Sequence, residues 1–141
     1  MTTKAVPSVK PLMPFVKLLT HDPEQLLPFY ESVFDFYVVD RVTELYPDND
    51  FGLEEIILHS GHDQGCTLVL LRFLHRPNPP GGVILGMKVA DVATTIERVL
   101  AAGGTVELPL EEMHRHGVRV AFAKDPHGNL IEIIETMDIK D

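Results

Sequence analysis

Apolar residues recur along the chain at strand and helix spacings, and the order of these spacings repeats once. In the first half, Met13 to Thr20 is an apolar run short enough for a strand, and helical spacing follows it. The helix begins at Asp22, which can cap it, and Pro23, which suits the first helical position. Strand-like runs come next, at residues 36–45, 53–58 and 66–73. The first half is therefore predicted as strand, helix and three strands.

The second half repeats this order after a linker rich in proline and glycine. A strand is predicted at residues 83–89, a helix from Asp91 to the glycines at 103–104, and strands at about 105–110, 116–123 and 129–135. We expect one α+β domain over residues 1–141, built from two βαβββ modules. Their approximate ranges are 12–74 and 83–137, joined by a linker at 75–82. Each helix should cover one side of a sheet.

The size, charge and hydrophobicity of the chain argue against some classes of binding partner. The chain has 141 residues, a suitable size for one compact domain, and a net charge of −9 from 21 acids and 12 bases. This charge argues against nucleic acid, which is bound by clustered Lys and Arg. It favours either simple solubility or a cationic ligand. No apolar run approaches the roughly 18 residues of a membrane span.

Cysteine usage and the N-terminus bear on location. The single cysteine, Cys66, excludes an intrachain disulfide, and residues 1–11 lack the long apolar centre of a secretion signal, so this segment is expected to be a loose arm. We expect a cytoplasmic protein without a membrane partner.

The last hairpin carries the most informative pattern. Asp125-Pro-His-Gly-Asn129 has the residues of a tight turn between two strand-like runs. In the second run, alternation places Glu132 on the same face as Leu130 and Ile134. Two interpretations stay open for this acid: a carboxylate at a wet sheet rim, or a functional group in an apolar pocket.

These residues resemble a known family. The segment from Asp125 to Glu135 resembles the closing motif of the vicinal-oxygen-chelate superfamily, which includes glyoxalases, extradiol dioxygenases and bleomycin- and fosfomycin-resistance proteins. The segment from Pro14 to Asp22, the pair Phe29-Tyr30 and the turn at residues 33–36 resemble the family's opening strand and first helix. The resemblance implies that the sheets of the two modules curl together around a cleft.

The resemblance also implies where a divalent metal would bind. Family members that use a metal hold it with residues on the first and last strands of each module. By position these residues are Phe15, Leu70 or a neighbour within 67–71, Ile84 and Glu132. Three of the four are apolar and cannot donate an electron pair. We therefore predict no metal ligand and no cofactor; the alternative is one divalent ion held by altered ligands.

Polar residues near these positions are further candidates for ligand binding. Lys17 and Lys88 share strand faces with Phe15 and Ile84, and Lys88 could pair with Glu132, although both lysines could also extend from strand ends into solvent. His116 could enter the cleft as a donor or base, or lie in a loop with His114. Glu132 is the candidate catalytic residue. The predicted walls are Phe15, Leu19, Leu68, Leu70, Ile84, Leu130 and Ile134.

Other reactive side chains have simpler structural interpretations. His59 and His62 lack an acid or cysteine that would complete a metal site, and His127 is expected to face solvent. Cys66 is expected in the core. Arg72 is expected to form an ion pair at the rim, with an anionic ligand as the alternative.

Two functions of different class remain. The first is a metal-free protein that binds a small, mostly apolar molecule in a cleft, usually between the two subunits of a homodimer, as the resemblance to bleomycin-resistance proteins implies. The second is a metal-dependent lyase, isomerase or dioxygenase with altered ligands, or a reaction that uses Glu132 without an ion. The apolar ligand positions favour the first.

Overall fold

The computed structural model describes residues 11–137, and its elements follow the predicted order twice. The first module contains β1 (Phe15–Leu19), α1 (Pro23–Phe34), β2 (Tyr37–Glu44), β3 (Leu53–His59) and β4 (Thr67–Phe73). The second contains β5 (Ile84–Lys88), α2 (Val92–Ala101), β6 (Thr105–Met113), the 3-10 turn η1 (His114–His116), β7 (Val118–Lys124) and β8 (Leu130–Thr136). The predicted α+β class and repeated βαβββ order are confirmed.

Two sequence predictions concern the N-terminal arm and a membrane span. The arm expected at residues 1–11 lies, except for residue 11, outside the described residues. Between residues 11 and 137, neither helix has the length and apolar character needed to cross a bilayer.

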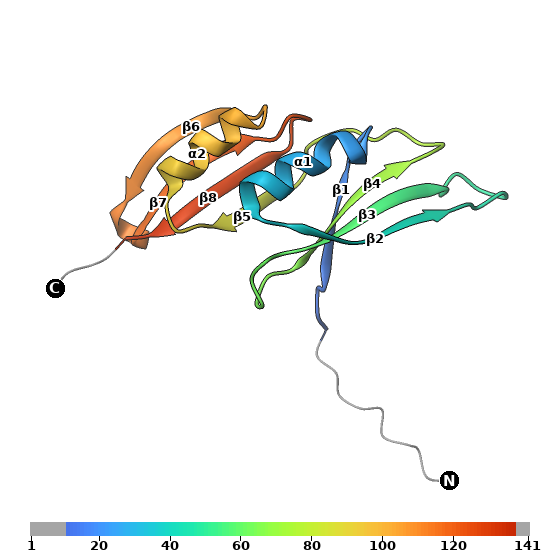
Figure 1. Cartoon of the computed structure of the whole chain (residues 1–141), viewed down its shortest axis with the longest axis horizontal. Coiled ribbons are helices and arrows are strands. Elements are labelled where there is room, and N and C mark those ends of the chain that lie inside the picture. The colour runs from blue at the N-terminus through green and yellow to red at the C-terminus, as the bar shows by residue number, and fades with distance from the viewer. Residues whose placement is uncertain (1–10, 138–141) are drawn as a thin grey trace, which may run out of the picture.

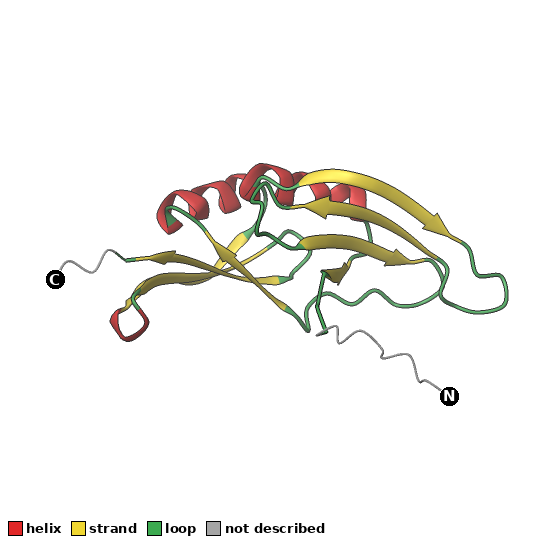
Figure 2. Ribbon diagram, turned by 90° about the horizontal axis from the view of Figure 1, so that it is seen from below, coloured by secondary structure: helices red, strands yellow, loops and turns green. Residues whose placement is uncertain are grey.

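The strands form two separate four-stranded sheets. Sheet A has the order β1-β4-β3-β2 and sheet B has the order β5-β8-β7-β6. Each first strand pairs in parallel with the last strand of its module, and the other neighbours are antiparallel. The modules lie side by side (Figure 1), and both helices run along one side of the molecule (Figure 2). The two sheets do not close on each other within this chain, because β1 and β5 each end a separate sheet.

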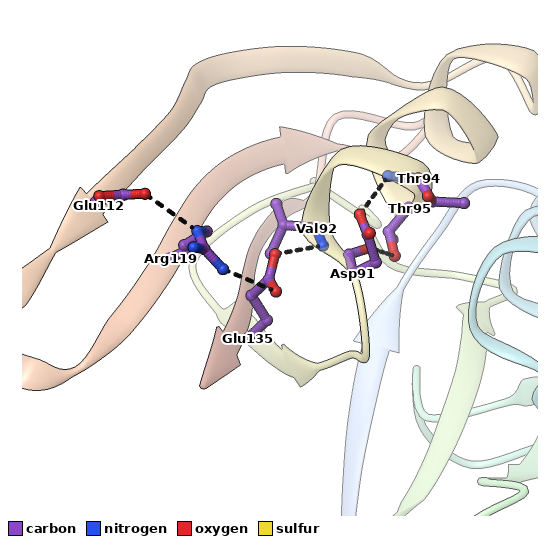
Figure 3. Close-up of polar contacts among 7 residues, drawn as sticks. All are labelled: Asp91, Val92, Thr94, Thr95, Glu112, Arg119 and Glu135. Atoms are coloured by element: carbon purple, nitrogen blue, oxygen red, sulfur yellow. Dashed lines mark hydrogen bonds and ion pairs between the residues drawn. The ribbon is translucent and has the colours of Figure 1, made fainter. Parts of the chain in front are cut away.

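Both helices begin where the sequence places an aspartate. The side chain of Asp22 accepts a hydrogen bond from the backbone N–H of Gln25, and that of Asp91 accepts one from Thr94. At α2, Glu135 of β8 also accepts from the N–H of Val92 (Figure 3). Carboxylates at this end satisfy N–H groups that lack a partner within the helix. They also fix the first turn of α2 against its own sheet.

The core lies between the helices and the sheets. Helix α1 contacts β3 and β4, α2 contacts β6, β7 and β8, and the two helices contact each other. Alternate strand residues face this core, and the fully or nearly fully buried ones include Leu18, Ile56, Leu58, Leu68, Leu70, Ala121, Ala123, Ile131 and Ile133. Burying one such large side chain stabilises the fold by about 1.5–3 kcal/mol.

A glycine lets the two modules approach closely at the end of α2. A Cβ atom on Gly104 would lie 2.6 Å from the backbone oxygen of Lys124 and 3.0 Å from the Phe29 ring of the first module. Any larger residue would push this contact apart. The glycine predicted as a helix stop thus also allows α1 to pack against the second module.

Candidate functional site

The predicted ligand positions Phe15, Lys17, Ile84, Lys88 and Glu132 lie on the face of each sheet that is turned away from its helix, here called the open face. On sheet A, this face carries Phe15 and Lys17 of β1. The parallel register sets Phe15 opposite Thr67 and Lys17 opposite Val69. Paired residues share a face, so Val69 belongs to the open face. Phe15 is 48% exposed, which is unusual for an aromatic side chain in a strand.

The same register corrects the placement of Leu70. Leu70 pairs with Leu18, is 0% exposed and belongs to the core beneath α1, together with Leu68. Both residues were predicted as pocket walls beside Phe15, but they lie on the opposite face of the sheet, where Leu68 lines a cavity between the modules. In sheet B the corresponding parallel pair sets Gly86 opposite Glu132. The counterpart of Glu132 in the first module is therefore Val69, which lies within the predicted range 67–71.

Glu132 is a carboxylate on an apolar face. Its neighbours across the strands are Gly86 and Phe122, and Leu130 and Ile134 flank it along β8. Its side chain is partly exposed, and no hydrogen bond or ion pair to it is formed within residues 11–137. Lys88 lies on the same face, opposite Ile134, but the predicted ion pair between Lys88 and Glu132 is not formed within the described part of the chain. The carboxylate is thus available to a ligand or to water.

On the open face of sheet A the charged residues form an ion pair with each other, unlike Glu132 on sheet B. Lys17 forms a 2.7 Å ion pair with Glu55, whose side chain is only 10% exposed. The ammonium group also lies 5.5 Å from the centre of the Phe15 ring. Lys17 is therefore held by groups of its own module, and Glu55 is a site residue that the sequence analysis missed. The sequence gives no local signal for this role, because Lys17 and Glu55 lie in strands that are distant along the chain.

The side chains at the family's metal positions do not suit a metal. Phe15, Val69 and Ile84 offer no lone pair, so Glu132 is the single donor among the four positions. Over residues 11–137, His, Cys, Asp and Glu side chains form no group of three that could hold an ion. One carboxylate alone does not hold a transition metal against water. We therefore derive no chemistry through a metal.

Several reactive side chains lie away from the open faces. His116 is in η1, before β7 begins at Val118, so it is exposed in a turn and does not line a strand face. Cys66 is exposed, which corrects its predicted place in the core, because β4 begins one residue later. Arg72 forms the expected ion pair, with Glu54 at 2.6 Å.

A cavity of about 840 Å³ lies between the modules, beside the edge of β5. Ile84 and Lys88, two of the predicted ligand-binding residues, line it. The end of α1, the β3–β4 hairpin and the start of α2 complete its wall. Ile84 is 56% exposed. A volume in this range can accommodate a small organic molecule.

The turn between β7 and β8 joins the modules. The buried Asp125 carboxylate accepts hydrogen bonds from the Tyr30 hydroxyl, the backbone N–H groups of His127 and Asn129, and the Asn129 side chain. Burial, and then the nearby Asp125 charge and the hydrogen bond to it, raise the pKa of Tyr30 well above its ordinary value. His127 is partly buried against β1 and α1, so its predicted exposure is wrong. The sequence signals are Phe29-Tyr30 and Asp125-Pro126, but neither segment indicates locally that it pairs with the other module.

Comparison with protein families agrees with this fold and its repeated elements. The model of the Glyoxalase/Bleomycin resistance protein/Dioxygenase superfamily matches residues 12–133. The chain belongs to this superfamily. No curated protein matches the chain.

Solved structures of superfamily proteins share the fold at low sequence identity. A glyoxalase family protein from Bacillus cereus has a TM-score of 0.74 at 17% identity, with 95% of this chain and 100% of that chain covered. A glyoxalase-related enzyme from Fulvimarina pelagi has a TM-score of 0.62 at 24% identity, with 89% and 88% covered. Glyoxalase I from Zea mays has a TM-score of 0.69 at 18% identity, with 89% of this chain and 45% of that chain covered. This chain therefore spans about half the length of the maize enzyme.

Proposed function

We propose that this protein binds a small, mostly apolar molecule against β5 and β8 without the divalent ion of metal-dependent superfamily members. The observation that carries the proposal is the set of apolar side chains at Phe15, Val69 and Ile84, which leaves Glu132 as a lone carboxylate. The cavity beside β5 offers space for such a molecule; Ile84 and Lys88 belong to its wall, whereas Glu132 lies on the neighbouring strand β8 and does not line it. The open face of sheet B, where Ile84, Leu130 and Ile134 surround Glu132, has the apolar surroundings and few polar groups that are typical of sites for small organic ligands.

The role proposed for Glu132 is recognition. A carboxylate without a protein partner, next to Phe122, Leu130 and Ile134, can accept hydrogen bonds from a ligand or pair with a positive group on it. The partly shielded setting would strengthen such a contact relative to one in bulk water. Catalysis by Glu132 alone would require a substrate proton within hydrogen-bond reach.

We further propose that a second copy of the chain completes the site. Strands β1 and β5 each end a sheet, and Phe15 and Ile84 on these strands are about half exposed. Exposed strand edges that carry apolar residues favour pairing with another chain. A homodimer that covers these edges would bring the open face of one sheet A toward a sheet B of the partner. Sedimentation at micromolar concentration should then give twice the chain mass of 15.8 kDa; a mass of one chain contradicts the dimer.

A thermal-shift panel tests the binding proposal. Compounds should include apolar aromatic molecules with and without an amine, in buffer containing a chelator. A ligand that binds only the native state raises Tm as its concentration exceeds Kd. Ile84→Asp should abolish the shift, whereas Leu45→Asp, at a 71% exposed position in the other module, should retain it. No shift from any compound, or an equal shift in both variants, contradicts the proposal.

A further inference from the structure

The imidazole of His127 bridges the two modules through both of its ring nitrogens. Nδ1 lies 2.6 Å from the hydroxyl oxygen of Thr20, and Nε2 lies 3.0 Å from the side-chain oxygen of Gln25. Thr20 follows β1 and Gln25 is in the first turn of α1, whereas His127 is in the turn between β7 and β8. The ring therefore ties the start of the first module to the end of the second.

The hydrogen bonds favour one neutral form of the ring. Gln25 presents an oxygen, so Nε2 must carry a proton and donate it. The oxygen of Thr20 already accepts from the N–H of Asp22 at 3.1 Å, which leaves its hydroxyl proton to be donated to an unprotonated Nδ1. In this arrangement both nitrogens of His127 and the hydroxyl of Thr20 are satisfied.

A second proton on the ring would disrupt this arrangement. Nδ1 would become a donor, so the Thr20 hydroxyl would have to turn its proton elsewhere. Thr20 is only 2% exposed, and within residues 11–137 its hydroxyl has no other acceptor. A buried donor without a partner costs about 1–3 kcal/mol.

The charges around the ring add to this effect. The ring of His21 stacks on that of His127, with centroids 4.2 Å apart and planes at 23°. Two protonated rings in this stack would repel each other. Asp22 and Asp125 act in the opposite direction, but both oxygens of Asp125 are already occupied by four donors. Desolvation, and then His21, outweigh these acids and lower the pKa of His127 from its ordinary value.

We propose that the stacked pair of His21 and His127 is an acid-sensitive joint between the modules. When the pair is neutral, His127 links the β7–β8 turn to Thr20 and Gln25. When His127 is protonated, Nδ1 becomes the donor to the Thr20 oxygen, the Thr20 hydroxyl proton is left without an acceptor among residues 11–137, and the link weakens. The orientation of the two modules would then respond to mild acidification, independently of any ligand.

The sign of the effect follows from proton binding. Because its folded-state pKa is lowered, His127 binds fewer protons in the folded than in the unfolded protein between the two pKa values. Its contribution to stability is complete above the unfolded value of about 6.5 and is lost as pH falls from there to the folded value. The joint should therefore weaken below neutral pH.

Histidine titration by NMR, combined with urea unfolding at several pH values, tests the proposal in the full chain. The His127 midpoint should lie below its own midpoint in urea-unfolded protein, and it should rise in His21→Phe, which retains a stacked ring without the charge. The decline of unfolding free energy between pH 7.5 and 5 should be smaller in His21→Phe and His127→Gln than in the native chain. His75→Gln, which changes an exposed histidine without a hydrogen bond or ion pair among residues 11–137, should leave the decline unchanged.

Two results would overturn the proposal. One is a His127 midpoint in the folded protein at or above its unfolded value. The other is the same decline with pH in the native chain and in folded His21→Phe and His127→Gln. If His127→Gln does not fold, the midpoint of His127 in His21→Phe decides the question, since a midpoint that stays unchanged contradicts the proposed repulsion.

Discussion

The hydroxyl of Tyr30 donates a 2.7 Å hydrogen bond to the carboxylate of Asp125, a residue 95 positions later in the chain. Tyr30 is 0% exposed and Asp125 is 3% exposed, so water does not replace this contact in the folded protein. The bond joins α1 of the first module to the turn before β8, the strand that carries Glu132. It therefore couples the packing of the modules to the position of the candidate site.

Removing this hydroxyl should destabilise the fold. Tyr30→Phe keeps the ring but leaves the buried Asp125 carboxylate with one donor fewer, which should lower the free energy of unfolding by about 1–3 kcal/mol. Urea unfolding at neutral pH measures the change. Tyr37→Phe is the matched control, because Tyr37 is 52% exposed and its loss should change stability by less than about 0.5 kcal/mol. Equal effects of the two substitutions would contradict the role given to Tyr30.

High pH should weaken the same contact. Burial and Asp125 raise the pKa of Tyr30, so the folded state keeps this proton at a pH where the unfolded state releases it. Stability from Tyr30 is therefore present below the unfolded value of about 10 and is lost as pH rises through the folded value. The unfolding free energy of the native chain should fall between pH 9 and 11, and less steeply in Tyr30→Phe. Parallel curves would contradict this prediction.

The ion pair between Lys17 and Glu55, on the open face of sheet A, should contribute more to the free energy of unfolding than an ion pair between two exposed side chains. Lys17→Met leaves the largely buried Glu55 without its cation, and we expect a loss of about 1–3 kcal/mol in unfolding free energy. Arg41→Met removes a pair with Glu24 in which both side chains are more than half exposed, and it should cost at most about 1 kcal/mol. Chemical unfolding of both variants measures the difference. A larger loss from Arg41→Met would show that Glu55 does not depend on Lys17.

Much of the fold was predictable because its signals are local. Asp22, Pro23, Asp91 and the turn at Asp125 fix where helices and hairpins begin, and the observed elements differ from the predicted ones mainly at their ends. The face on which Leu70 lies was not predictable from its own segment. Residues 67–71 read Thr-Leu-Val-Leu-Leu, which is apolar on both faces, so alternation gives no direction. Only the pairing with β1, which is distant in sequence, determines it.

The candidate site was predictable to the same extent. Glu132 interrupts the apolar run of β8, and the period of two gives Leu130 and Ile134 as its neighbours on the same face, so this arrangement followed from the sequence. The contacts of Glu55 and His127 did not, because their partners Lys17, Thr20 and Gln25 belong to elements far away in the chain. Ion pairs and hydrogen bonds between distant segments leave no periodic signal in the sequence.

The metal content of the purified protein tests the central proposal most directly. Protein prepared without chelator and without added metal should contain far less than one ion of Zn, Ni, Fe or Mn per chain, because Phe15, Val69 and Ile84 supply no donor beside Glu132. Elemental analysis of the native chain and of Glu132→Ala should therefore give the same low values. Stoichiometric metal in the native chain that disappears in Glu132→Ala would contradict the account.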